Sequence, residues 1–183
     1  MDDEPSSSPR QSGNTEHTLD VEISDTDRLL DGVVLDWLRK ASGTVFQRLK
    51  SRGEIRVRLV DDASMCKAHA QYCGLDSTAD VLTFDLAPGE TLENKVLDTD
   101  LIVCVDEASR QAANRAHRVE HELLLYILHG VLHCLGYDDH SDEAFARMHA
   151  REDELLDESG YGKLFSAPYN TMQKQSAEKE DQS

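Results

Sequence analysis

The chain has 183 residues, of which 39% are hydrophobic, and this is enough for one domain with a buried core. Acidic residues outnumber basic residues by 36 to 19, which gives a formal net charge of −17. This acidic bias excludes proteins that coat nucleic-acid duplexes or membrane surfaces by simple charge attraction.

The cysteines and the N-terminus indicate the cellular compartment. The four cysteines form no C-x-x-C pair, and three of them stand in apolar surroundings: Cys66, Cys73, Cys104 and Cys134. We expect buried free thiols in a reducing cytoplasm. The polar N-terminus lacks the apolar stretch of a signal peptide, and no apolar run approaches the roughly 20 residues that a membrane span needs. These features predict a soluble, cytoplasmic protein.

The two ends of the chain differ in composition from its middle. Residues 1–17 and 167–183 are polar and contain too few apolar residues to bury a core. We therefore predict two disordered tails around a single domain over residues 18–166.

The pattern of apolar residues predicts nine elements within that domain. Alternating or continuous apolar residues predict strands over 18–24, 55–59, 78–84 and 101–105. Helical spacing predicts helices over about 26–49, 63–72, 106–116, 119–135 and 142–156, with a polar connection over 88–98. The order predicts an α+β fold, in which a small mixed sheet of about four strands packs with about five to six helices. The helix over 119–135 is unusually apolar, so we expect it to be central and buried.

Two histidines in this apolar helix are the candidate metal ligands. His129 and His133 are four residues apart, so their imidazoles point the same way and can bind one ion. A third ligand is expected just past the end of the helix. The H-x3-H-x5-ligand spacing of metzincin-type zinc proteins favours Asp139, and His140 is the alternative. Asp138 is predicted to orient one of the ligand histidines.

The types of these ligands favour zinc, but the surrounding sequence does not match the zinc peptidase motif. Histidine with carboxylate suits one zinc ion, or a related divalent transition metal, better than magnesium or calcium. The H-E-x-x-H peptidase motif requires a glutamate after the first histidine, where this chain has Gly130. His121 and Glu122 begin such a motif, but Leu125 occupies its fifth position. His117 and His121 are expected to be a solvated pair, and no residue stands out as a general base.

Three blocks of sequence resemble the YbeY family of bacterial rRNA-maturation endoribonucleases. Residues 129–138, HGVLHCLGYD, are similar to the family signature H-G-x-L-H-L-x-G-Y-D-H. Residues 76–84, DSTADVLTF, resemble its D-x-P-T-D-V-L-S-F strand, and residues 100–105, DLIVCV, resemble its G-D-I-x-I-C strand. The resemblance covers residues 21–156 with the blocks in the same order and at matching spacing.

The resemblance implies a cytoplasmic enzyme with a zinc-type ion held by three ligands from the signature. It also implies cleavage of single-stranded RNA, late in rRNA 3′-end maturation and in quality control of the small ribosomal subunit. Neither a membrane nor DNA is expected as a partner. Two other functions stay open: a zinc peptidase or other metallohydrolase, and a non-catalytic ribosome assembly factor whose metal is structural.

The chain departs from the family pattern at two positions. Asp139 stands where the family has its third histidine, and Cys73 stands where the family tends to have an arginine. That arginine would be a natural phosphate contact. Arg56, Arg58 and Lys67 are the candidates to supply its charge.

Overall fold

A computed structural model describes residues 18–87 and 96–165 of the chain. Its elements are β1 (Leu19–Ser24), α1 (Gly32–Phe46), β2 (Arg52–Val60), α2 (Asp62–Cys73), β3 (Val81–Asp85), β4 (Val96–Cys104), α3 (Val105–Arg115), α4 (Val119–Cys134) and α5 (Asp142–Glu158). This is the predicted order, and the α+β fold class is confirmed with four strands and five helices in these residues. The predicted tails lie outside the described residues.

The four strands form one mixed sheet in the order β1-β2-β4-β3. β1, β2 and β4 are parallel, whereas β3 lies antiparallel to β4 at the edge. The strand predicted from its apolar run is therefore interior, as expected. It is longer than predicted, however, because Leu97 and Thr99 continue the alternation of buried residues back to Val96. Of the polar connection expected over 88–98, only 96–98 lie within the description, and they belong to this strand.

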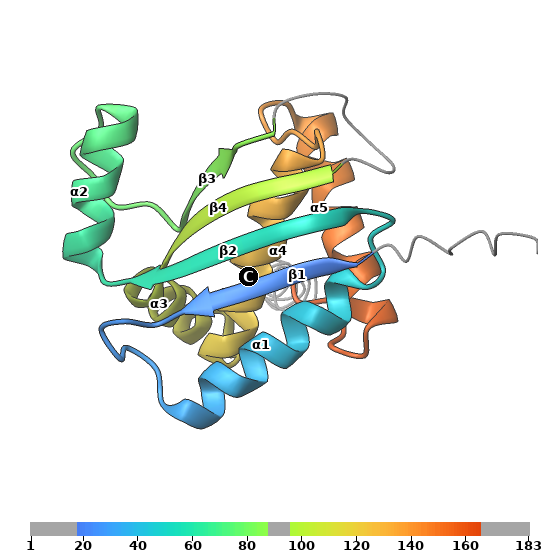
Figure 1. The fold of residues 1–183 in the computed structure, drawn as a ribbon, viewed down its shortest axis with the longest axis horizontal. Coiled ribbons are helices and arrows are strands. Elements are labelled where there is room, and N and C mark those ends of the chain that lie inside the picture. The colour runs from blue at the N-terminus through green and yellow to red at the C-terminus, as the bar shows by residue number, and fades with distance from the viewer. Residues whose placement is uncertain (1–17, 88–95, 166–183) are drawn as a thin grey trace, which may run out of the picture.

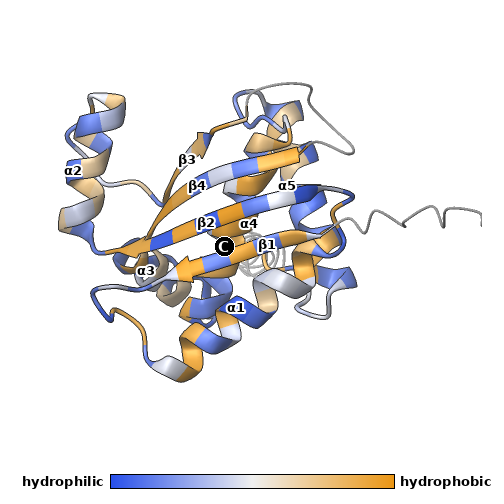
Figure 2. Ribbon diagram, in the orientation of Figure 1, coloured by the Kyte–Doolittle hydropathy of each residue, from blue (hydrophilic) through white to orange (hydrophobic). Residues whose placement is uncertain are grey.

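The two faces of the sheet have different coverings. Ile55, Val57 and Leu59 of β2 belong to the main core, together with buried residues of α1, α4 and α5, and these helices lie behind the sheet in Figure 1. Met65 of α2 packs against the opposite face, in a small cluster that includes Cys104. The strands alternate between hydrophobic and hydrophilic residues in Figure 2, as a sheet with one fully covered face requires.

Helix α4 is the central buried helix that its composition predicted. Twelve of its sixteen residues are buried, and it contacts β3, β4, α1, α3 and α5. Leu123, Leu124 and Ile127 are fully enclosed. His129 and His133 are exceptions on this helix, since both are partly exposed. The fold therefore presents two polar side chains from the mostly apolar second half of this helix.

Side-chain caps set the ends of the helices. Helix α1 begins at Gly32, later than predicted, because Asp25 instead accepts hydrogen bonds from the backbone N–H groups of Leu29 and Leu30 in a preceding turn. The Asp31 carboxylate then caps α1. Ser141 caps α5 by accepting a hydrogen bond from the N–H of residue 144. This cap fixes where α5 begins, close to the end of α4.

Gly130 lies where α4 crosses the sheet most closely. A Cβ atom at this position would lie 2.8 Å from Leu101 Cδ2 and 2.9 Å from Thr83 Oγ1. These distances are shorter than real Cβ contacts, so a side chain here would force the side chains of Leu101 and Thr83, or α4 itself, to shift. The glycine directly after His129 is therefore a packing requirement of this fold, and no peptidase glutamate fits there.

We predict that Gly130→Ala destabilises the protein by about 1–3 kcal/mol, because it overpacks the contact between α4 and the sheet. Urea unfolding followed by circular dichroism measures the change. Gly43→Ala in α1 is the matched control, since nothing lies within 4 Å of its Cβ and alanine favours the helix by about 1 kcal/mol. Equal stability of Gly130→Ala and the wild type would contradict the close contact.

Candidate metal centre

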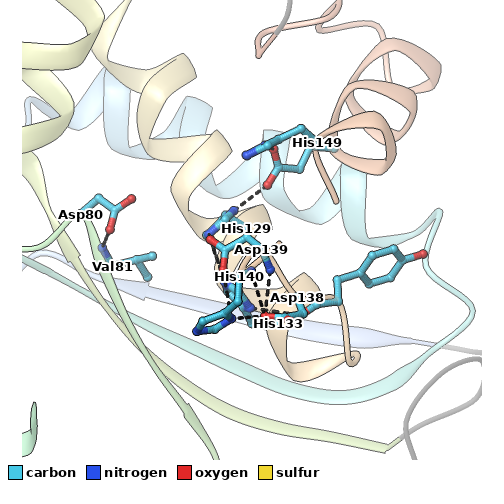
Figure 3. A network of polar contacts seen from close by, with 10 residues as sticks. Asp80, Val81, His129, His133, Asp138, Asp139, His140 and His149 are labelled. Carbon is cyan, nitrogen blue, oxygen red and sulfur yellow. Dashed lines mark hydrogen bonds and ion pairs between the residues drawn. The ribbon is translucent and has the colours of Figure 1, made fainter. Parts of the chain in front are cut away.

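His129, His133 and Asp139 bring three ligand atoms together at the end of α4, as Figure 3 shows. The two histidine Nε2 atoms lie 3.1 Å apart. Asp139 Oδ2 lies 3.7 Å from Nε2 of His129 and 3.9 Å from Nε2 of His133. The three side chains are 16%, 29% and 33% exposed, so solvent and a ligand can reach them. These are the three residues that the sequence pattern selected.

The turn after α4 carries Asp139 back to the histidines. Gly136 has a φ of +90°, in the left-handed region that glycine adopts at low cost. Its N–H bonds the carbonyl of His133 at 2.9 Å, and the N–H of Tyr137 bonds the carbonyl of Leu132 at 3.0 Å. Paired bonds of this kind reverse the chain at a helix C-terminus. The glycine of the signature therefore serves to position the third candidate ligand.

Both histidines are oriented through their other ring nitrogen. His129 Nδ1 lies 2.7 Å from Oε1 of Glu152 on α5, and His133 Nδ1 lies 3.1 Å from the backbone carbonyl of Tyr137. Both partners are acceptors, so each Nδ1 carries the proton and donates it. The lone pairs of both Nε2 atoms are then free to point at an ion, as in zinc sites whose histidines bond carboxylates or carbonyls.

Glu152 is a completely buried carboxylate that two histidines share. It accepts hydrogen bonds from Nδ1 of His129 and, through Oε2, from Nδ1 of His149. Burial raises the pKa of this carboxyl, but the bonds and charges of the two histidines outweigh burial and leave the pKa below its usual value. Burial likewise lowers the pKa of His129, and Glu152 more than reverses that effect. The shared carboxylate therefore connects α5 to α4, the helix that carries both candidate histidine ligands.

The geometry of the three atoms fits a divalent transition metal. Ligands of one tetrahedral zinc ion lie about 3.3 Å apart, because each is about 2.0–2.2 Å from the metal. The observed separations of 3.1, 3.7 and 3.9 Å are close to this value. Within residues 18–87 and 96–165, two further groups could hold an ion, but one uses Glu152 and the other is the run 138–140 on the outer turn. Only the first group combines oriented histidines with a free carboxylate oxygen.

Asp138 and His140 occupy the outer side of this turn. The Asp138 carboxylate bonds the ring of His140 and accepts from the N–H of Asp139 at 2.9 Å. The role predicted for Asp138, orienting a ligand histidine, is instead filled by Glu152 and the Tyr137 carbonyl. The hydrogen bond that His140 donates to the Asp138 carboxylate raises the pKa of His140, whose side chain is highly exposed. Asp138 therefore braces the turn, while Asp139 faces the histidines.

The histidine pair at the start of α4, with His117 just before the helix and His121 within it, is not the solvated pair that its position suggested. His117 bonds Oε2 of the buried Glu122, and the ring of His121 packs against Trp37 at 5.2 Å between centroids. Both side chains are partly buried. The two histidines therefore have structural partners at the far end of α4 from the candidate metal centre.

The basic residues proposed to replace the family arginine lie elsewhere. Arg56 projects from the other face of the sheet and pairs with Asp98 and Asp100, and it lines a pocket with Arg58 that contains none of the candidate ligands. Lys67 lies on α2. None of these three residues lines the pockets at the candidate metal centre. The position where the family tends to have an arginine, in contrast, lies close to the candidate metal centre.

That position is held by Cys73, which lines a groove of about 760 Å³ together with His133 and Asp139. None of the four cysteines forms a disulfide, and only Cys104 and Cys134 are buried, whereas Cys66 is partly buried and Cys73 is exposed. The expectation of buried thiols was therefore right for two residues and wrong for Cys73. A short side chain at this place leaves the groove open.

The sequence pattern did not point to Glu152 or His149. They stand three residues apart on α5, but 23 residues separate Glu152 from its partner His129. A glutamate in an amphipathic helix usually faces solvent, and no spacing rule links it to a ligand in the preceding helix. Only the packing of α5 against α4 reveals the connection.

Comparison with known proteins identifies one family. The family model for endoribonuclease YbeY matches residues 15–160. Endoribonuclease YbeY of Pelotomaculum thermopropionicum is 36% identical over 106 residues, which cover 56% of this chain and 70% of the relative. The protein of that name from Shouchella clausii is 29% identical over 156 residues, covering 79% of this chain and 98% of the relative. The chloroplastic endoribonuclease YBEY of Arabidopsis thaliana is 36% identical over 109 residues, but these cover only 19% of that protein.

We predict that Glu152→Leu weakens zinc binding about 10- to 100-fold, because it removes the acceptor that orients His129. Competition with a chromophoric chelator, starting from metal-free protein, measures the dissociation constant. Glu154→Leu is the control on the same helix, since Glu154 is exposed and pairs with Arg151. Equal affinity in both variants would contradict a positioning role for Glu152.

Proposed function

Since this chain belongs to the endoribonuclease YbeY family, we propose that it cleaves single-stranded RNA with the help of one bound zinc ion. The observation that carries this proposal is the group of His129, His133 and Asp139 at the edge of two open pockets. A bound zinc ion would polarise a phosphodiester oxygen, activate a water molecule, or do both. The three residues are the proposed ligands, and Asp139 is preferred to His140.

The residues around the candidate metal centre support a catalytic site more than a structural one. A structural zinc site usually supplies four protein ligands, whereas a catalytic site supplies three and leaves one position open. Here three ligand atoms converge, and their side chains are partly exposed. Glu152 and the Tyr137 carbonyl hold the imidazoles in place. The chain therefore presents a rigid, accessible site for a substrate oxygen.

The family relationship supports a specific RNA substrate. We propose that the chain acts late in the maturation of the rRNA 3′ end and in quality control of the small ribosomal subunit, in the cytoplasm. Within the described residues, no helix is both long and apolar enough to cross a membrane. The net charge of −17 disfavours binding of duplex DNA by charge alone.

A ribosome assembly factor with a structural metal is the second candidate function. The observation in its favour is Cys73, which stands where relatives of the family tend to have an arginine. A peptidase is less well supported, because Gly130 packs directly against Leu101 and Thr83 and leaves no space for a glutamate after His129. Turnover of a peptide substrate by the purified protein would restore the peptidase candidate.

We predict that the purified chain cleaves single-stranded RNA, that a chelator abolishes cleavage and that zinc restores it. The double variant His129→Ala/His133→Ala is expected to lose both the metal and the activity. Metal content by mass spectrometry and cleavage on denaturing gels measure the two effects. His69→Ala serves as control, since this histidine lies on α2 and bonds the Ser77 carbonyl.

Two outcomes would overturn parts of this account. Full metal content in the double variant would contradict the ligand assignment. A zinc-loaded wild-type protein that binds RNA without cleaving it would favour the assembly factor.

A further inference from the structure

A pocket of about 550 Å³ opens beside the candidate metal centre, between the end of α3, α4 and α5. His129 and Asp139 line it, so it is continuous with the metal site. The groove described above, which ends at Tyr72 and Cys73, also includes His129 and Asp139. The candidate metal centre therefore adjoins two open spaces that share His129 and Asp139.

Aromatic side chains are concentrated along these two spaces. Tyr72 is 56% exposed and Phe145 is 44% exposed, and they are the two exposed aromatic residues among those described. Tyr72 lines the groove and Phe145 lines the pocket. Exposed rings cost free energy in water unless a partner covers them. Each ring lines one of the two spaces that adjoin the candidate metal centre, which indicates an extended partner that contacts both spaces.

The ring of Phe145 is held in a fixed orientation. It packs edge-on against His149, with 4.1 Å between centroids, and His149 in turn stacks on Phe165 at 3.5 Å and 4°. His149 is itself fixed by its bond to buried Glu152. A ring that is rigid but exposed is a suitable platform for stacking a planar ligand.

Among the described residues, Arg115 is the one guanidinium that lines this pocket, whose lining also includes the carboxylates of Asp80, Asp139 and Glu152. It is the single arginine or lysine among the described residues that line either space. Nη1 lies 3.3 Å from Oε1 of buried Glu122, which anchors the side chain. The guanidinium carbon lies 5.8 Å above the centre of the Phe165 ring, and that ring lies 5.8 Å from Phe145. One aromatic ring thus connects the cation to the exposed platform.

We propose that this pocket binds one unpaired nucleotide of the RNA next to the cleaved bond, with its base on Phe145 and its phosphate on Arg115. A planar base stacks on an aromatic ring, and a guanidinium binds phosphate oxygens. A base in a duplex has both faces covered, so only a single strand can offer it. The proposal rests on the RNA cleavage proposed above and explains its preference for single strands. Arg115 thereby takes the part of the arginine that is missing at Cys73.

The test is binding of a short, cleavage-resistant single-stranded RNA to the zinc-loaded full chain, measured by fluorescence anisotropy. Phe145→Leu keeps an apolar side chain but removes the stacking face, and we expect it to weaken binding roughly tenfold. Phe145→Trp is expected to restore affinity. The exposed position of Phe145 leaves folding intact, which circular dichroism and zinc content check.

The charge is tested by the salt dependence of the same binding. Arg115→Gln is expected to lower the slope of log affinity against log salt by about 0.7, the value for one phosphate contact with a single strand. Arg147→Gln is the control, because Arg147 is exposed on α5 and pairs only with Glu143 among the described residues. An unchanged slope in Arg115→Gln would remove this residue from the proposal.

The outcomes separate this proposal from the function on which it rests. If the wild type cleaves RNA while Phe145→Leu binds it equally well, the nucleotide pocket is wrong and the nuclease function stands. If the zinc-loaded wild type neither binds nor cleaves RNA, both proposals fail. A 2-aminopurine base that changes fluorescence with the wild type but not with Phe145→Leu would support stacking at this ring.

Discussion

The hydrogen bond between His129 Nδ1 and the buried carboxylate of Glu152 is the contact on which the candidate metal centre depends. It fixes the tautomer of His129, directs Nε2 towards His133 and Asp139, and joins α5 to α4. The same carboxylate holds His149, which in turn supports Phe145 and Phe165. A completely buried carboxylate is costly to place unless it is paired, so this arrangement constrains the packing of both helices. The candidate metal ligand His129 and the residues His149, Phe145 and Phe165, which line the neighbouring pocket, are therefore held together by one carboxylate.

Close packing of α4 on the sheet provides the second constraint. Gly130 allows the helix to touch Leu101 and Thr83, and this brings the histidine face to the open edge of β3. Gly136 then reverses the chain so that Asp139 returns to the histidines. The two glycines of the signature therefore act through backbone geometry, and this geometry positions the three candidate ligands.

Local patterns were sufficient to predict the order of elements, the buried helix and the group of His129, His133 and Asp139, because helical spacing and turn chemistry act over a few residues. Contacts between distant segments were not predictable in this way. Glu152, which orients His129, comes from another helix, and His117 bonds a buried glutamate. Arg56 forms ion pairs with two carboxylates on the far face of the sheet. The start of α1 was misplaced for a related reason, since Asp25 caps a separate turn. In the proposed function, Arg115 is the cation that this acidic chain offers to a phosphate of the RNA.

The third ligand is the most direct test of the account, because Asp139 and His140 are neighbours with different surroundings. Asp139 faces the histidines, whereas His140 is exposed and bonds Asp138. Zinc content after gel filtration of Asp139→Ala and His140→Ala compares them. The account predicts that Asp139→Ala loses its zinc and that His140→Ala retains one ion per chain. Retention of zinc by Asp139→Ala, with loss by His140→Ala, would contradict it.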